Sequence, residues 1–174
     1  MSDELKKVLE GCGAILHGDF TLASGKKSEY YVDIKRATTD PKVLGLIADQ
    51  MAKEIEGEGF QRVAGVALGS VPLAVALSLR TGIPFVMVRK EKKDHGTGKL
   101  IEGQLNPGEK VLVVEDVITS AGSAVYAVET LRHAGADVGT VMSVVDREEG
   151  GREALRELDV EMRALISASR ILGR

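Results

Sequence analysis

The sequence predicts an α/β fold, in which a mostly parallel, twisted sheet is flanked by helices. A small N-terminal unit of about residues 1–40, called the hood, precedes it. Short, strongly apolar runs such as residues 111–114 are typical of strands that are buried on both faces. Segments with helical periodicity follow these runs, so that strand and helix alternate between about residues 63 and 145. Polar segments come directly after two of the strands, and ligands bind outside the carboxyl ends of the strands in such sheets.

The length and composition favour one domain over residues 1–174. The chain is 44% hydrophobic and 28% charged, which is ordinary for a globular protein. Its net charge of −3 gives no basic field, so nucleic acid is not an expected partner. Cys12 is the only cysteine, which excludes an internal disulfide and suits a reducing compartment. Because neither a secretory signal nor a membrane-length apolar run occurs, we expect a cytoplasmic protein without membrane contact.

The first 40 residues or so would form the hood. Its expected elements are a helix at 3–10 and strands at 14–16, 20–22 and 30–33. A turn at 17–19 would separate the first two strands, and the polar segment 23–29 precedes the third. Tyr30 and Tyr31 stand beside that segment and could cover a flat ligand, although packing is the commoner role of such a pair.

The core, about residues 41–150, begins with a well-marked helix. Asp40 can cap its N-terminus, Pro41 suits the first helical position, and apolar residues follow at helical spacing. The next predicted helix, 72–80, is mostly apolar, so we expect it to be largely buried. The remaining expected elements are strands at 63–67, 84–88, 111–114 and 138–145 and a helix that ends near His133.

Two adjacent carboxylates, Glu115 and Asp116, follow the strand 111–114 at its carboxyl end. The residues Thr119–Ser123 are small or hydroxylated and lead into a helix, whose N-terminus favours anions. Acceptors for hydroxyl groups beside donors for an anion suit a ligand that carries both hydroxyls and phosphate. A strand followed by a capped helix, with no ligand, is the alternative for a carboxylate pair alone.

A strongly charged segment, Arg89–Lys99, follows the strand at 84–88. It holds five basic residues and His95, shows no apolar periodicity and contains two glycines. Cations on a long loop can close over a polyphosphate and exclude water, so we interpret about residues 89–105 as a mobile lid. A plain solvated loop is the alternative interpretation.

Familiar nucleotide-binding motifs are missing from the sequence. No Gly-x-x-x-x-Gly-Lys-Ser/Thr segment occurs, and no Gly-x-Gly pair has the third glycine of a dinucleotide-binding fingerprint. Serine-elbow and His-Glu-x-x-His patterns are absent as well. A phosphate ligand must therefore be held by other means.

Residues 113–123, Val-Val-Glu-Asp-Val-Ile-Thr-Ser-Ala-Gly-Ser, resemble the 5-phosphoribosyl-1-diphosphate (PRPP) motif of type I phosphoribosyltransferases. Three further stretches resemble the orotate phosphoribosyltransferases of that superfamily: Phe20–Tyr31, Arg89–Gly96 and Val145–Gly150. Purine-salvage enzymes and some regulators share the PRPP motif. The lid and the Asp-Arg-Glu-Glu-Gly stretch narrow the resemblance, which covers about residues 8–150, to the orotate enzymes.

The resemblance implies that orotate and PRPP react to give orotidine 5′-monophosphate and pyrophosphate, with Mg²⁺ as cofactor. Glu115 and Asp116 would bind the ribose hydroxyls, and their charge would favour the cationic ribose of the transition state. The 5′-phosphate would be held through backbone N–H groups and hydroxyls by Thr119, Ser120, Ala121, Gly122 and Ser123. Val117 and Ile118 would also belong to the PRPP site. The pyrophosphate would be gripped by Arg89, Lys90, Lys93 and His95. The implied catalytic residues are Lys93, His95, Glu115 and Asp116.

The resemblance also implies how the pyrimidine and the metal are bound. Arg147 would pair with the orotate carboxylate, to which its planar fork is suited, whereas without the resemblance it would be an ordinary surface arginine. Thr119, Tyr30 and Tyr31 would lie near the base. No side chain would bind the metal directly, because Mg²⁺ would be held by substrate oxygens. The family's lid closes over the neighbouring subunit's site, which implies a homodimer.

Two positions depart from the pattern of many relatives. Ala23 in the hood loop and Gly69 in the turn after the strand 63–67 stand where many members have lysine. Backbone N–H groups can bind pyrophosphate at the second position. A regulator that senses PRPP and controls transcription is the alternative function from another class, but the segment before residue 14 is too short for a helix-turn-helix. A purine-salvage enzyme is a further alternative, but Arg147 and the hood loop argue against it.

Overall fold

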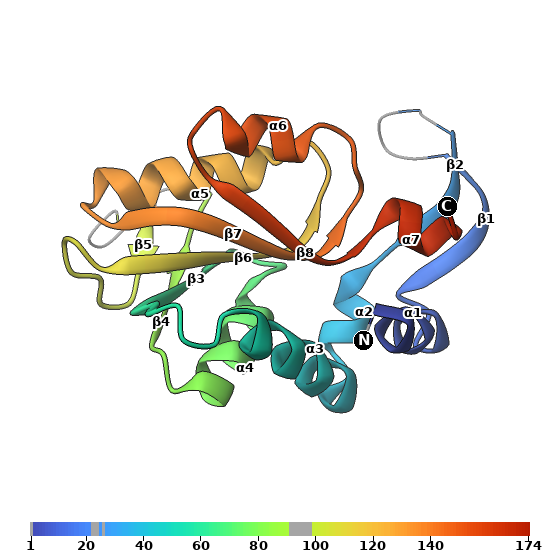
Figure 1. Cartoon of the computed structure of the whole chain (residues 1–174), viewed down its shortest axis with the longest axis horizontal. Coiled ribbons are helices and arrows are strands. Elements are labelled where there is room, and N and C mark those ends of the chain that lie inside the picture. The colour runs from blue at the N-terminus through green and yellow to red at the C-terminus, as the bar shows by residue number, and fades with distance from the viewer. Residues whose placement is uncertain (1, 22–24, 26, 91–98) are drawn as a thin grey trace.

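The computed structural model describes residues 2–21, 25, 27–90 and 99–174, and a six-stranded sheet forms its centre (Figure 1). The strands are β3 (Arg62–Val66), β4 (Phe85–Val88), β5 (Ile101–Glu102), β6 (Lys110–Ile118), β7 (Asp137–Asp146) and β8 (Glu161–Ser167). They lie in the order β5-β4-β3-β6-β7-β8, and only β4 and β5 pair antiparallel. The carboxyl ends of the parallel strands therefore meet at one edge of the sheet, which confirms the predicted fold class.

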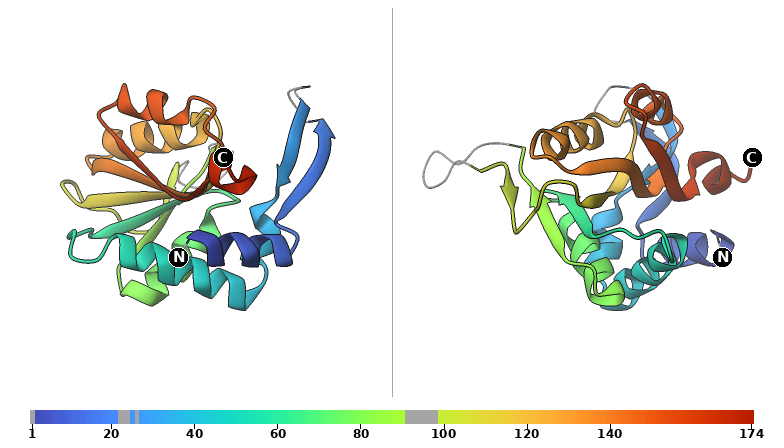
Figure 2. Two further views of the ribbon diagram at one scale, coloured as in Figure 1. Left: turned by 45° about the vertical axis from the view of Figure 1, so that its right-hand side comes forward. Right: turned by 60° about the vertical axis from the view of Figure 1, so that its left-hand side comes forward.

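Helices cover both faces of this sheet (Figures 1 and 2). The helices on one face are α5 (Gly122–His133) and α6 (Gly151–Arg156), and those toward the other are α1 (Ser2–Gly11), α3 (Pro41–Glu54) and α4 (Val71–Thr81). Each face has its own apolar core. Leu112 and Val113 are neighbours on β6 but belong to different cores, because successive side chains of a strand point to opposite faces.

A two-stranded antiparallel sheet forms the hood beside this core (Figure 2). Its strands are β1 (Ile15–Thr21) and β2 (Lys27–Val32). The turn predicted at 17–19 is wrong, because the pairing only shifts register between His17 and Phe20, so that this segment is a bulge within one strand. Asp33, predicted as the end of the third strand, instead caps α2 (Ile34–Thr38) by accepting a hydrogen bond from the Lys35 N–H.

Two core elements differ from their predictions. The strand predicted at 111–114 runs from Lys110 to Ile118, so Glu115 and Asp116 lie within it rather than beyond its end. The helix predicted at 72–80 is buried along one face only, and Leu79 on its other face is 84% exposed. The apolar run of β6 thus ends before the strand does, and the apolar run of α4 extends beyond the face that is buried.

The predicted start of α3 is confirmed. Asp40 accepts hydrogen bonds from the N–H groups of Lys42, at 2.8 Å, and Val43, at 3.2 Å, and Pro41 follows it. The elements without a sequence prediction are short or at the end of the chain: α2, β5, α6, β8 and α7 (Ala168–Leu172). Within the described ranges, no helix is long and apolar enough to cross a membrane.

Candidate active site

Glu115, near the carboxyl end of β6, is buried with 5% of its surface exposed. Its Oε2 accepts a hydrogen bond from the hydroxyl of Ser70, a buried residue in the turn between β3 and α4. Its Oε1 is also buried and has no hydrogen-bond partner among the residues that the structure describes. Because a buried polar atom is costly without a partner, this oxygen is a ready acceptor for a hydroxyl donor.

Burial raises the pKa of Glu115 to about 7, because the charged carboxylate loses its hydration. The hydrogen bond from Ser70 and the charge of Lys90 lower this pKa, while the charge of Asp116 raises it. The carboxyl group therefore titrates near neutral pH. Such shifts are frequent at functional sites, and here the shift coincides with an unpartnered oxygen.

Asp116 faces the same turn between β3 and α4. A Cβ atom placed on Gly69 would lie 2.6 Å from Oδ2 of Asp116, so only glycine permits this close approach. Its Oδ1 accepts a hydrogen bond from the N–H of Val117 at 2.9 Å. Gly69 thus lies against Asp116 and Ser70 binds Glu115, which couples the end of β3 to the end of β6.

A pocket of about 260 Å³ lies beside the end of β6. It is lined by Glu115 and by the unbroken run 117–124. Ala121 precedes α5 with a left-handed backbone, at φ 65°, and no side chain in the described part of the sequence caps this helix. The first N–H groups of α5 can therefore bind an anion, which the helix dipole favours.

Arg147 directly follows β7 and contacts the hood. Its guanidinium lies over the ring of Tyr30, 4.8 Å from the ring centre, and its Nε donates a hydrogen bond to Glu149 at 2.8 Å. Its backbone N–H donates to the carbonyl of Ile118 at 2.9 Å. A cation stacked on an aromatic ring is favourable, and the arrangement holds the guanidinium between the sheet and the hood.

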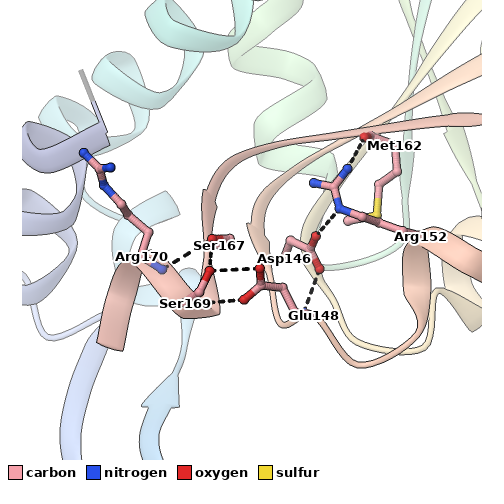
Figure 3. A network of polar contacts seen from close by, with 7 residues as sticks. All are labelled: Asp146, Glu148, Arg152, Met162, Ser167, Ser169 and Arg170. Carbon is pink, nitrogen blue, oxygen red and sulfur yellow. Dashed lines mark hydrogen bonds and ion pairs between the residues drawn. The ribbon is translucent and has the colours of Figure 1, made fainter. Parts of the chain in front are cut away.

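A network of carboxylates holds the turn after β7 (Figure 3). Asp146 is fully buried and accepts hydrogen bonds from the Glu148 N–H, at 2.8 Å, and from Nε of Arg152, at 2.7 Å. Arg152 also donates to the carbonyl of Met162 on β8, at 2.8 Å. Glu148 reaches across to α7, where it accepts hydrogen bonds from the N–H of Ser169, at 2.6 Å, and from its hydroxyl, at 2.9 Å.

A second pocket, of about 430 Å³, lies between this turn, the hood and α7. Tyr30 and Arg147 line it together with Lys27 of the hood and Arg174 beyond α7. Its three cations outnumber the two carboxylates of its lining, Glu148 and Glu149, which makes it suitable for a small anionic ligand. The two pockets adjoin neighbouring strand ends, since β6 and β7 are paired in the sheet.

A model of the phosphoribosyl transferase domain family matches residues 35–170 of this chain. The chain is also 53% identical to an orotate phosphoribosyltransferase of Methanosarcina mazei, over 97% of this chain and 90% of that protein. The chain belongs to the orotate phosphoribosyltransferase family. An orotate phosphoribosyltransferase of Pyrococcus abyssi is 47% identical over 97% of this chain and 94% of its own length.

Solved structures of the family have the same fold. The crystal structure of orotate phosphoribosyltransferase from Aeropyrum pernix matches with a TM-score of 0.88 and 37% identity, over 97% of this chain and 96% of that one. The enzyme of Mycobacterium tuberculosis H37Rv in complex with PRPP matches with a TM-score of 0.81 and 32% identity, over 98% of both chains. In that protein, PRPP is therefore a bound ligand.

The structure brings together most of the residues expected to hold PRPP. Glu115 and residues 117–123 line the pocket beside β6, and Asp116 lies next to the turn after β3. Lys90 is close enough to Glu115 to lower its pKa. Thr119, expected near the base, belongs to the same pocket.

The lid residues are placed only in part. The carbonyl of Arg89 accepts a hydrogen bond from the Tyr126 hydroxyl at 3.0 Å, and its guanidinium lies 3.7 Å from the carboxylate of Glu102. These contacts anchor the first residue of the expected lid to α5 and β5. Lys93 and His95 lie outside the described residues, as does Ala23 of the hood loop.

The two tyrosines expected near the base lie on opposite faces of β2. Tyr30 is buried against Arg147, whereas Tyr31 is 43% exposed and contacts the ring of Phe20, with ring centres 5.7 Å apart. This follows from the alternation of side chains along a strand. Only Tyr30 lines the pocket that contains Arg147.

Three residues of the site were not predicted from the sequence: Ser70, Glu148 and Ser169. Ser70 stands in a predicted turn, and a serine there has many ordinary roles. Glu148 belongs to the Asp-Arg-Glu-Glu-Gly stretch, which points to the region but not to the function of this side chain. Ser169 follows the stretch covered by the family resemblance, and no motif surrounds it.

Proposed function

We propose that this chain is an orotate phosphoribosyltransferase, which transfers the 5-phosphoribosyl group of PRPP to orotate in the synthesis of UMP. The observation that carries this proposal is the 53% identity with the Methanosarcina mazei enzyme over nearly the whole of both chains. The geometry supports it, because a pocket lined by Glu115 and the start of α5 lies next to a pocket in which three cations outnumber two carboxylates. One site suits a phosphorylated sugar, and the other suits a nucleobase that carries a carboxylate.

The end of β6 would bind the phosphoribosyl group. Residues 119–123 would hold the 5′-phosphate through backbone N–H groups and hydroxyls. Glu115 and Asp116 would accept hydrogen bonds from the 2′- and 3′-hydroxyls of the ribose, and the unpartnered Oε1 of Glu115 supports this role. As pyrophosphate leaves, positive charge develops on the ribose ring, and nearby carboxylates stabilise it.

The end of β7 would bind the pyrimidine. Arg147 would pair with the orotate carboxylate through charge-assisted hydrogen bonds, and Tyr30 would hold the guanidinium from the opposite side. Tyr31 and Thr119 remain candidates for contacts with the base. This arrangement gives selectivity for orotate, because a pyrimidine without the carboxylate would not form this second pairing with Arg147, whose Nε already donates to Glu149.

The lid would act on the leaving pyrophosphate. Arg89, Lys90, Lys93 and His95 would neutralise its charge, with Lys93 and His95 contributing to catalysis. We include in the proposal a homodimer in which each lid closes over the partner's site. Mixing Lys93→Ala with Asp116→Asn chains should then restore part of the activity, because one site of a heterodimer receives both intact residues. Heterodimers that stay inactive would exclude a shared lid.

Mg²⁺ is the cofactor in this proposal. Within the described ranges, no group of three or more histidine, cysteine, aspartate or glutamate side chains could hold a metal ion. The cation would be held by pyrophosphate and ribose oxygens and by water, with Glu115 and Asp116 nearby to bind the ribose hydroxyls. When bound, it would neutralise the pyrophosphate. A cytoplasmic location completes the proposal.

The test is a rate measurement with several bases. Purified protein, PRPP and Mg²⁺ would be mixed with orotate, and the loss of orotate absorbance would be followed, with uracil, adenine and hypoxanthine as parallel substrates. Consumption of orotate alone is the expected result. If no base reacts while PRPP still binds, the enzyme assignment is wrong and a PRPP-sensing regulator takes its place.

A further inference from the structure

Glu148 has an unusual backbone and an unusual partner. Its φ of 57° lies in the left-handed region, which is uncommon for residues other than glycine. Its carboxylate accepts two hydrogen bonds from a single residue of α7, Ser169, which is 21 positions further along the chain. Glu148 is therefore the bridge between the turn after β7 and the C-terminal helix (Figure 3).

The other groups of this turn are fixed independently. The buried carboxylate of Asp146 accepts the backbone N–H of Glu148, and the backbone N–H of Arg147 donates to Ile118. The side chain of Glu149 accepts a hydrogen bond from Nε of Arg147. Arg147 also contacts Tyr30 of the hood, and the contact of Glu148 with Ser169 joins the same turn to α7.

We propose that Glu148 is a positioning residue for Arg147, and that α7 belongs through it to the pyrimidine site. This inference rests on the proposed function, since it assigns Arg147 to the orotate carboxylate. The bridge to Ser169 holds the left-handed turn at residue 148, and this turn directs the preceding side chain toward Tyr30. Arg147, Glu148 and Ser169 line the same pocket, which supports a common role.

The contacts of the C-terminal segment favour the same conclusion. Ser167 Oγ lies 3.0 Å from Ser169 Oγ and accepts a hydrogen bond from the N–H of Arg170, so the first turn of α7 is held by its own serines. Arg174, beyond the end of α7, donates to Glu29 of the hood at 2.8 Å. The C-terminal segment therefore contacts both the turn after β7 and the hood, between which the pocket with Arg147 lies.

The test compares Glu148→Ala and Ser169→Ala with the wild-type enzyme. Glu148→Ala should raise the KM for orotate about fivefold, because both hydrogen bonds to α7 are lost, and Ser169→Ala should raise it about twofold. The KM for PRPP should stay within about twofold in each variant, since its site is a separate one. Glu153→Ala, which removes a carboxylate from an exposed position on α6, is the matched control.

A double mutant separates positioning from general support. In an Arg147→Ala background, Glu148→Ala should change the KM for orotate by less than about twofold, because the residue through which it acts is gone. A full further increase in that background would overturn the inference, and so would an unchanged orotate KM in Glu148→Ala. If Glu148→Ala fails to fold, Ser169→Ala in the same two backgrounds carries the test. A wild-type protein that does not consume orotate would overturn the proposed function, and this inference with it.

Discussion

The ends of β6 and β7 lie side by side but are built in different ways. The pocket at the end of β6 is lined by residues of one short segment, namely Glu115 and residues 117–124. The pocket at the end of β7 is lined by three segments that are far apart in the sequence, namely the hood, the turn after β7 and the C-terminal helix. The first forms with its strand and helix, whereas the second requires that the hood and α7 dock correctly.

This difference predicts that the two substrates respond to different kinds of change. Binding of PRPP should depend on residues at the end of β6 and in the turn after β3. Binding of orotate should also depend on side chains that never touch it. Variants that affect one KM and spare the other can therefore confirm or break the comparison.

The largest expected effect is that of Arg147→Ala. Losing a charge-assisted pair with the carboxylate should raise the KM for orotate about 100-fold. Arg156→Ala, at the exposed end of α6, removes the same charge and should leave the kinetics unchanged. Initial rates at varied orotate and saturating PRPP measure the effect. An orotate KM that stays at the wild-type value would remove Arg147 from the pyrimidine site.

Gly69→Ala tests the end of β6 from outside its own segment. The added Cβ would lie 2.6 Å from Oδ2 of Asp116 and would displace that carboxylate, so the KM for PRPP should rise about tenfold. Gly45→Ala is the matched control, because no atom lies within 4 Å of its Cβ position and alanine favours the helix. Saturation curves for both substrates decide the matter. If orotate binding suffers as much as PRPP binding, the two ends are not separate.

The pH dependence of kcat/KM for PRPP should report Glu115. The carboxylate must be ionised to accept hydroxyl hydrogen bonds, so this ratio should rise through a pKa of about 7. Ser70→Ala removes a donor that lowers this pKa, so its profile should move to higher pH. At pH 7 the loss should be about threefold, and it should vanish by about pH 9. An unshifted profile would show that the hydrogen bond does not tune the carboxyl group.

The same carboxyl group should affect stability with the opposite sign. Its folded-state pKa of about 7 lies above its ordinary value of 4.5, so the folded state binds more protons between these limits. The free energy of unfolding should therefore fall as the pH rises from about 4.5 to about 7. Glu115→Gln should lose this part of the dependence, which thermal melts at several pH values would detect. Parallel Tm profiles of the two proteins would contradict the assignment.

A small effect is expected for Tyr30→Leu. It removes the stacking of Arg147, which should raise the KM for orotate about threefold while Arg147 itself remains. Phe60→Leu is the matched control, because it removes another ring that stacks on a cation. Lys110 lies 4.6 Å from the centre of that ring, and neither residue lines the pockets at the ends of β6 and β7. Steady-state rates with orotate compare the two variants. A larger effect in Phe60→Leu would point to stability rather than to stacking.

The same contrast explains what the sequence could predict. The run from residue 111 into α5 carries its strand, its carboxylates and its anion loop in one stretch, so pattern and resemblance agree there. The prediction that the strand stops at Val114 is wrong, because β6 continues while its side chains become polar. Ser70 was not predicted as a partner of Glu115, since only the parallel pairing of β3 and β6 brings them together.

The end of β7 was much harder to predict. Arg147 could be named only from the resemblance, and its stacking on Tyr30 depends on how the hood docks. The contact of Glu148 with Ser169 joins two short segments without a periodic pattern, and a helix of five residues such as α7 gives too few residues for one. Long-range polar contacts of this kind leave no trace in local composition.

The most direct test of the separation between the two ends is a calorimetric titration of Arg147→Ala with PRPP in the presence of Mg²⁺. Because the end of β6 and the turn after β3 would bind PRPP without Arg147, its Kd should stay within about twofold of the wild-type value. The same variant should bind orotate far more weakly. A Kd for PRPP weakened tenfold or more, about 1.4 kcal/mol, would contradict the account, because the end of β7 would then be part of the PRPP site.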